Sequence, residues 1–285
     1  MYNLHLKTSH FPAQTDTEIR DISVGGLLRE IASSNPHSIA MVDVLEDGKC
    51  GQSWTYSELA HQAKSLAQTL ASRFAPRERI VVWAPNIPEW IFLEYAAGLA
   101  GLVLVTANPS FQTAELKYVL DQSGAVGLFM IDEFRGNPME EIAKEATKGN
   151  THLRETVNLH RKDILFKIGD RPTLLPNVHP DDPAQIQYTS GTTGFPKGAI
   201  LSHKNLVNNA RLFCARKHVT QHSVWANFMP LFHTAGCATG ALGCLQAACK
   251  MLLIKRFDSD IFARLIEEQK VTTCFAVPTM LFNLL

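Results

Sequence analysis

The chain has 285 residues, and its 27 Lys and Arg balance 27 Asp and Glu, so the formal net charge is zero. This length is enough for one large domain or two smaller ones, and the charge balance gives no indication of binding to nucleic acid or an anionic membrane. The 6 cysteines form no Cys-x-x-Cys pair, which favours a reducing compartment over a disulfide framework.

The first half predicts alternating helices and strands. Thr55 and Glu58 have the spacing of a capping box, and apolar residues at 59, 63, 66 and 70 follow the helical period. Short apolar runs at 80–84, 102–105 and 126–131 predict buried strands. Helices are expected from Asn86, as the cap, to about Gly98 or Gly101, and over 113–123 before Gly124. This order predicts an α/β fold with doubly wound, mostly parallel sheets flanked by helices.

Four prolines weaken the pattern between residues 134 and 182, where we expect one helix over 139–147 and a surface connection. Ser202 is a candidate cap for a helix over 204–216, and Asp258 or Ser259 for one over 259–269. A small-residue helix over 234–248, strands at 224–229, 251–254 and 272–276, and a helix from Pro278 complete the pattern. We expect a first α/β subdomain over 1–180 and a second over 181–285. The chain stops within an apolar pattern, so we expect a truncated second subdomain.

No apolar signal sequence is visible in residues 1–14. Residues 219–249 lack Lys, Arg, Asp and Glu, but Pro230 interrupts them and they never reach the ~18 consecutive apolar residues of a membrane helix. We expect no transmembrane segment and a cytoplasmic location. His218 and His222 are four residues apart, but the sequence between them is typical of a turn, so we expect no metal site there.

A loop rich in glycine and hydroxyl residues lies between two short apolar runs. Its glycines permit close approach of a ligand, its hydroxyls and backbone N–H groups are donors, and its lysine is a compact cation. Such a loop suits a polyphosphate, although a solvated loop is the alternative from composition alone. It fits neither the Walker spacing nor the dinucleotide fingerprint. The candidate residues are Thr189, Ser190, Gly191, Thr192, Thr193, Gly194 and Lys197.

The order of residues from Tyr188 to His203, Tyr-Thr-Ser-Gly-Thr-Thr-Gly-Phe-Pro-Lys-Gly-Ala-Ile-Leu-Ser-His, resembles the phosphate loop of the adenylate-forming enzymes. This superfamily includes acyl-CoA synthetases, luciferases and adenylation domains. The resemblance extends from residues 54–60 through 84–90 and 108–109 to 277–280. It implies the N-terminal part of the large domain of such an enzyme, with ATP bound by the candidate loop residues and Mg²⁺ contacted by Thr189. His203 and Asn205 follow the loop, and we expect them to have capping or structural roles.

A second segment reads Met229-Pro-Leu-Phe-His-Thr-Ala-Gly236. Alone, it would be a strand-to-helix turn with an ordinary buried histidine. The resemblance implies that His233, Thr234, Ala235 and Gly236 line the carboxylate end of an acyl pocket, with space left by the small residues that follow. Amino-acid adenylation domains have a Phe-Asp-x-Ser pattern here, whereas this sequence has no carboxylate. Because a buried ammonium without a partner is unfavourable, we do not expect an amino-acid substrate.

The resemblance implies activation of a small-molecule carboxylic acid, expected to be a fatty acid, to acyl-adenylate with ATP and then to a thioester with coenzyme A. The alternatives are an acyl-AMP or aryl-CoA ligase, or a non-catalytic nucleotide-binding remnant. The family's later motifs, with a metal-binding Glu, a ribose-binding Asp and a C-terminal domain bearing the catalytic Lys, are not found in this sequence. We therefore assign no catalytic residue here, expect residues 1–285 alone to be inactive, and expect the missing C-terminal domain of the same protein as a partner.

Overall fold

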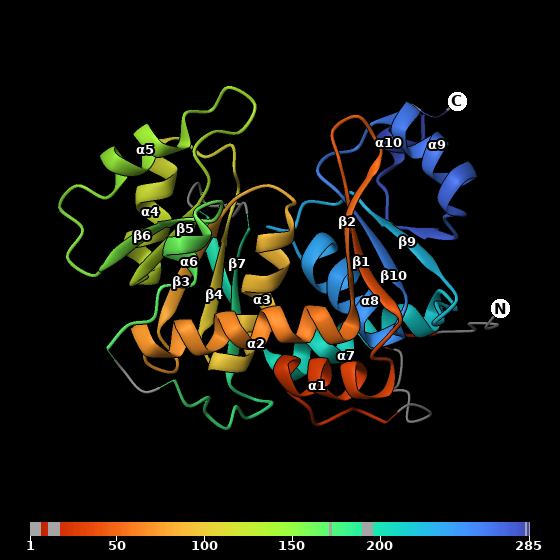
Figure 1. Ribbon diagram of the computed structural model, residues 1–285, viewed down its shortest axis with the longest axis horizontal. Helices are drawn as coiled ribbons and strands as arrows, with labels where there is room; N and C mark the ends of the chain where they lie inside the picture. The colour runs from red at the N-terminus through yellow and green to blue at the C-terminus, as the bar shows by residue number, and fades with distance from the viewer. Residues whose placement is uncertain (1–6, 11–17, 171–172, 190–195, 283, 285) are drawn as a thin grey trace.

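The computed structural model describes residues 7–10, 18–170, 173–189, 196–282 and 284, and contains two β-sheets side by side (Figure 1). One has six strands in the order β6-β5-β3-β4-β7-β8, and the other has five in the order β11-β9-β10-β1-β2. Helices pack around and between them. The expected α/β fold with mostly parallel sheets is confirmed.

In the six-stranded sheet only the β7–β8 pair is antiparallel. Its central strands are short apolar runs buried along their whole length, as expected where helices cover both faces of a parallel sheet. The strands are β3 Arg79–Trp83, β4 Val103–Ala107, β5 Gly127–Met130, β6 Glu155–Asn158, β7 Pro183–Thr189 and β8 Lys197–Ser202.

In the five-stranded sheet β11, β9, β10 and β1 are parallel, and β2 pairs antiparallel with β1 at one edge. The sequence did not predict the β1–β2 hairpin, because β2 lacks an apolar run and only Trp54 in it is buried. The strands are β1 Ile39–Val44, β2 Cys50–Thr55, β9 Val224–Asn227, β10 Lys250–Ile254 and β11 Thr273–Cys274. Each sheet thus takes strands from both sides of residue 180, and the division at 180/181 stays a prediction.

Most helices begin and end where local capping signals predict. Thr55 and Glu58 form the expected capping box, and Ser202 and Asp258 cap the helices that follow them. The helices are α1 Val24–Ser34, α2 Tyr56–Arg73, α3 Pro88–Ala100, α4 Thr113–Ser123, α5 Met139–Ala146, α6 Lys162–Leu165, α7 His203–Arg216, η1 Ala235–Leu242, α8 Gly243–Ala247, α9 Ser259–Gln269 and α10 Pro278–Phe282. None of the helices in the described part of the chain is both long and apolar enough to cross a bilayer.

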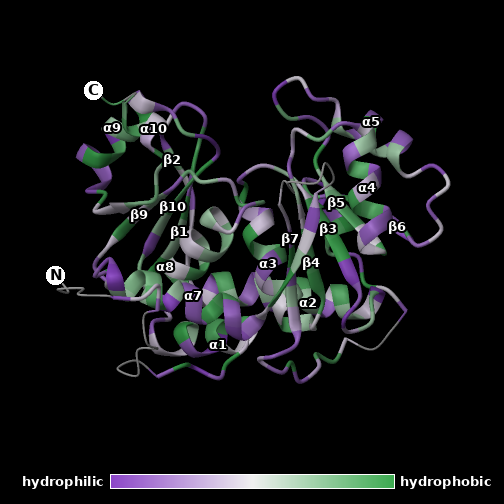
Figure 2. Cartoon of the chain, turned by 180° about the vertical axis from the view of Figure 1, so that it is seen from behind, coloured by the Kyte–Doolittle hydropathy of each residue, from purple (hydrophilic) through white to green (hydrophobic). Residues whose placement is uncertain are grey.

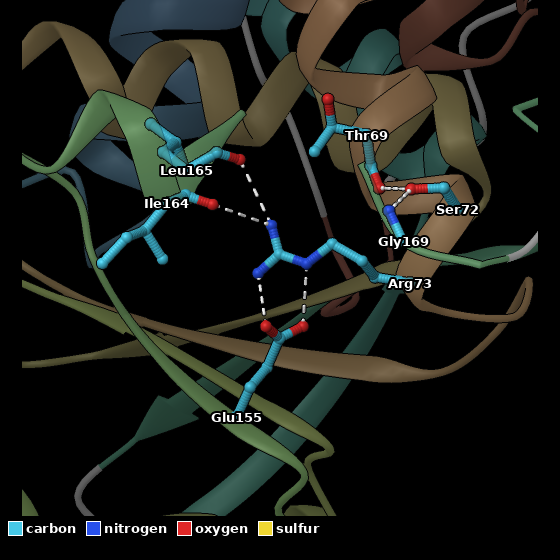
Figure 3. A network of polar contacts seen from close by, with 7 residues as sticks. All are labelled: Thr69, Ser72, Arg73, Glu155, Ile164, Leu165 and Gly169. Atoms are coloured by element: carbon cyan, nitrogen blue, oxygen red, sulfur yellow. Dashed lines mark hydrogen bonds and ion pairs between the residues drawn. The ribbon is translucent and has the colours of Figure 1, made fainter. Parts of the chain in front are cut away.

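Helix α2 runs beneath both sheets and connects them (Figure 1). Near its end, Arg73 makes a bidentate ion pair with Glu155 of β6, with Nε–Oε1 and Nη2–Oε2 distances of 2.9 and 2.6 Å. Its Nη1 also donates to the carbonyls of Ile164 and Leu165, and the neighbouring Ser72 hydroxyl accepts from the Gly169 N–H (Figure 3). Figure 2 shows hydrophobic residues concentrated in the strands and in the helices beside them.

One expectation about a helix start is wrong. Asn86 does not cap α3, which begins after Ile87 without a side-chain cap. Instead, Asn86 is buried; its amide donates to the carbonyls of Met229 and Ile254, and its oxygen accepts from the Leu231 N–H. The residue thus fixes the start of the segment that contains His233.

The expected single helix over 234–248 is a π-helix, η1, followed by the short helix α8. A Cβ on Gly236 would lie 2.2 Å from the Pro230 oxygen, and one on Gly240 would lie 2.5 Å from the Asn227 side chain. At these two positions the absence of a side chain allows close packing of the backbone. No open space is left next to these two glycines, whereas Ala238 between them lines a cavity.

Candidate functional site

Two of the phosphate-loop candidates, Thr189 and Lys197, lie on the β7–β8 hairpin. Thr189, the last residue of β7, pairs with Lys197, the first residue of β8. Because directly opposed residues of antiparallel strands project to the same face, the Thr189 hydroxyl and the Lys197 ammonium leave the sheet on one side. Both residues are exposed. The candidates Ser190, Gly191, Thr192, Thr193 and Gly194 lie outside the described residues.

Two tyrosines hold this hairpin at the end where β7 stops and β8 begins. The Tyr118 hydroxyl on α4 donates to the Pro196 carbonyl at 2.9 Å, and its ring packs edge-on against Tyr188 with centroids 6.4 Å apart. Burial raises the pKa of Tyr188 to about 12, so the phenol is neutral. A Cβ on Gly198 would lie 2.8 Å from the Ile186 side chain, which explains the glycine there. Both strands are therefore held in place next to the Thr189–Lys197 pair.

The second candidate segment turns from β9 into η1. His233 is exposed, and its Nδ1 accepts a hydrogen bond from the Ala235 N–H at 3.1 Å. An accepting Nδ1 carries no proton, so in the neutral imidazole the proton is on Nε2. Thr234 is half-buried, whereas Ala235 and Gly236 are buried. Of the four candidates, His233 and Thr234 have side chains that a ligand could reach.

A cavity of about 520 Å³ lies between α7 and η1. It begins at Leu201 on β8 and extends to Thr234 and Ala238, so it lies between the phosphate-loop strand and the His233 segment. Its lining is mainly apolar, with Leu206 and Leu212 among the α7 residues. Another cavity, of about 410 Å³, lies near the start of α3, and polar groups make up a larger share of its lining. None of the candidate residues contributes to it.

The residues that follow the loop have structural roles, as expected. Asn205 completes the capping box with Ser202. His203 is fully buried and its Nδ1 accepts from the Val24 N–H. Burial lowers the pKa of His203 to about 4, so the side chain is neutral at physiological pH. No group of three or more His, Cys, Asp or Glu within the described ranges is placed to hold a metal ion.

Sequence reasoning missed the polar residues that surround the site from within the core. Glu94, Thr106, Gln185 and Gln187 are all buried. A signal was present, because Glu94 directly follows the apolar run at 90–93 within α3, and the two glutamines flank Ile186 in the buried part of β7. Their partners come from distant elements, so the sequence did not show what these groups contact.

A mostly parallel two-sheet α/β fold of this kind is the architecture of the N-terminal domains of adenylate-forming enzymes. Residues 28–285 match the AMP-binding enzyme family, and the chain belongs to that family. The acyl-CoA ligase SID4 of Ajellomyces capsulatus is 31% identical over 80% of this chain and 42% of its own length. The human mitochondrial medium-chain acyl-CoA ligase ACSF2 is 28% identical over 97% of this chain and 50% of its own.

Among solved structures, the N-terminal domain of FACL13 from Mycobacterium tuberculosis has a TM-score of 0.79 and 25% identity, over 92% of this chain and 64% of that one. The chain spans about half the length of the curated relatives it matches. It corresponds to the N-terminal part of the enzyme fold.

Proposed function

We propose that the full-length protein activates a carboxylic acid with ATP and transfers the acyl group to coenzyme A. A carboxylate oxygen would attack the α-phosphorus of ATP, forming acyl-adenylate and releasing pyrophosphate. The thiol sulfur of coenzyme A would then attack the acyl carbon and release AMP. The observation that carries this proposal is the apolar cavity between α7 and η1, which lies between Leu201 of the phosphate-loop strand and Thr234 beside His233.

For the nucleotide, we propose the loop from Thr189 to Gly194 together with Lys197. The exposed Lys197 ammonium and Thr189 hydroxyl project to one side of the hairpin, a donor set that fits phosphate oxygens and, through Thr189, Mg²⁺. When bound, Mg²⁺ would supply Lewis-acid stabilisation of the phosphate charge. The residues of this chain would bind and orient the phosphates through preorganised donors.

For the acid, we propose that His233, Thr234, Ala235 and Gly236 form the carboxylate end of the pocket. The exposed His233 Nε2–H is a donor suited to a carboxylate oxygen. The cavity beside Thr234 has three leucines in its lining, together with Ile19, Ala238, Lys204 and three asparagines. No carboxylate among the cavity's lining residues could pair with a substrate ammonium, so amino acids are disfavoured. A fatty acid fits this lining best, and the name of the ACSF2 relative makes a medium-chain acid the first to test.

Residues 1–285 supply no group that we assign to catalysis, and we propose that catalysis requires a C-terminal domain of the same protein. All six cysteines are free thiols, which supports a reducing compartment such as the cytoplasm. The runner-up activities are those of an acyl-AMP ligase or an aryl-CoA ligase.

The test is to incubate the full-length protein with ATP, Mg²⁺, coenzyme A and a panel of alkyl, aryl and amino acids, and to identify products by mass spectrometry. We expect acyl-CoA from medium-chain or longer fatty acids. Acyl-adenylate that accumulates without acyl-CoA would favour the acyl-AMP ligase, and aryl-CoA alone would favour the aryl-CoA ligase. Turnover of amino acids only would contradict the proposal.

A further inference from the structure

A chain of buried polar side chains joins α3 to the His233 segment. Glu94 on α3, Gln185 and Gln187 on β7, and Thr106 on β4 are 3%, 2%, 5% and 2% exposed. The contacts along the chain are Glu94 Oε1 to the Gln185 amide at 2.6 Å, Gln185 to Gln187 at 3.0 Å, Gln187 to the Thr106 hydroxyl at 3.2 Å, and Thr106 to the Phe232 carbonyl at 2.7 Å. This chain of hydrogen bonds therefore ends on the peptide bond that precedes His233, and it crosses β7, the strand that ends at Thr189.

Stability alone is a weak reason for this arrangement. A satisfied internal hydrogen bond adds only about 1 kcal/mol, and apolar replacements of similar shape can be neutral. Connected buried polar groups instead specify one arrangement of the elements that carry them. Here those elements are α3, β4, β7 and the segment that leads into η1.

Counting the protons available for these hydrogen bonds shows how the two glutamine amides are oriented. With the Gln185 amide nitrogen facing Glu94, the Thr106 hydroxyl contacts two acceptors, Gln187 Oε1 and the Phe232 carbonyl, although it has one proton. The 2.6 Å contact at Glu94 is short for N–H···O, for which about 2.7–3.2 Å is usual, and ordinary for O–H···O. In addition, Glu94 Oε2 has no hydrogen-bond partner among the described residues, which an ionised, buried carboxylate would need.

Rotating the side-chain amides of Gln185 and Gln187 by about 180° exchanges the positions of oxygen and nitrogen. The donor–acceptor distances of the four contacts stay the same. A neutral Glu94 then donates to the Gln185 oxygen, and the Gln185 nitrogen donates to Gln187. The Gln187 nitrogen in turn donates to the Thr106 hydroxyl, whose single proton goes to the Phe232 carbonyl. Each hydrogen bond now has one proton and all four run in one direction. Burial, which raises the pKa of Glu94 to about 8, agrees with a neutral side chain at physiological pH.

We propose that Glu94 in its neutral form is a positioning residue, which through this one-way chain holds the Phe232 carbonyl, and with it His233, relative to the strand that carries Thr189. This inference rests on the proposed function of the site. Ionisation of Glu94 removes the first donor, so the amides turn back and Gln187 competes with Phe232 for the Thr106 proton. The acid-binding segment is then held less firmly.

Two other titratable groups face Glu94. Cys237, on η1, lies 3.3 Å from the Gln187 amide, and Tyr95, the next residue on α3, donates its hydroxyl to the Ala241 carbonyl. Burial raises the pKa of the Cys237 thiol and of the Tyr95 phenol well above their ordinary values. The groups that β4 and β7 contribute to the chain, Thr106 and the two glutamines, do not titrate. Glu94 is therefore the first group in this cluster to ionise as the pH rises.

The test uses acid-dependent pyrophosphate exchange by the full-length protein at pH 6.5–9.5. If only protein with neutral Glu94 binds the carboxylic acid substrate well, the wild-type KM for that substrate rises about tenfold one pH unit above the pKa of Glu94. About a tenth of the protein then still has neutral Glu94. Glu94→Gln keeps a donor and an acceptor but cannot ionise, so its KM stays close to the wild-type value at neutral pH and flat through pH 9. Glu89→Gln, on the same helix, is the matched control and keeps the alkaline rise. The same rise in Glu94→Gln would overturn the proposal.

A second measurement does not depend on activity. The infrared difference spectrum between wild-type protein and Glu94→Gln should contain the C=O band of a protonated carboxyl at pH 6.5, replaced by carboxylate bands at high pH. Carboxylate bands at pH 6.5 would overturn the proposal even if the enzyme were active. If no carboxylic acid supported pyrophosphate exchange, the proposed function would fail. The spectrum would still decide whether Glu94 is protonated and donates the first hydrogen bond of the chain.

Discussion

Thr189 and Lys197 face each other as antiparallel partners, where β7 ends and β8 begins. The hairpin thus places a hydroxyl and an ammonium on one side of the sheet. Tyr118 and Tyr188 fix the strands just below this pair. The pairing gives Lys197 a defined position, so its removal should affect phosphate binding more than folding.

Lys197→Ala in the full-length protein should lower the rate of pyrophosphate exchange by roughly 10- to 100-fold, because a charge-assisted contact to phosphate contributes about 1.5–3 kcal/mol. The melting temperature should hardly change, since the side chain is exposed. Lys64→Ala, an exposed lysine on α2, is the matched control and should have neither effect. Normal exchange with a large loss of stability would show that Lys197 is structural.

Gly236→Ala should damage the acid-binding segment. A Cβ there would lie 2.2 and 2.4 Å from the Pro230 and Met229 oxygens, so the backbone must move. We expect a stability loss of about 1–3 kcal/mol, as for other overpacked sites, and a higher KM for the acid. Gly243→Ala, whose nearest new contact is the Cys214 sulfur at 3.1 Å, should have a smaller effect on both. Equal effects of the two variants in denaturation and kinetics would contradict this account.

The stability of the protein should depend on pH through Glu94. Its pKa is about 8 when folded and near the ordinary 4.5 when unfolded. Between these values the folded state binds more protons, so stability falls as pH rises from about 5 to about 8 and then levels off. Glu94→Gln removes this contribution. We expect the difference in melting temperature between wild-type protein and variant to change in favour of the variant over this range, and a constant difference would argue against a raised pKa.

The Arg73–Glu155 pair should contribute measurably to stability. The Arg73 side chain is 8% exposed and makes a bidentate contact. Arg73→Met should destabilise the protein by about 1–3 kcal/mol, because it leaves Glu155 without its partner. Adding Glu155→Met should recover part of that loss. Arg161→Met, which breaks the exposed pair with Asp163, is the control and should hardly change the denaturation midpoint. A similar loss in the control would mean that burial of the Arg73 pair is unimportant.

Local signals in the sequence predicted much of the fold. Caps such as Thr55 with Glu58 and Ser202 with Asn205 act within one helical turn, so their spacing is visible in the sequence. Most expected strands and helices agree with the observed ends to within two residues. The type and position of these elements were therefore largely predictable.

Long-range contacts explain what the sequence did not predict. Asn86 resembles a helix cap, but its partners Met229 and Ile254 are far along the chain. The small residues of η1 suggested open space, whereas the backbone of residues 229–230 occupies the place next to Gly236. The loop candidates at 190–194 stay predictions.

The measurement that tests the central claim most directly is ATP–pyrophosphate exchange by the full-length protein with a single acid present at a time. We expect exchange with a medium- or long-chain fatty acid, no exchange without acid, and formation of the thioester and AMP once coenzyme A is added. Exchange with an amino acid but with no fatty or aryl acid, or no exchange with any acid under conditions where the protein is folded, would contradict the account.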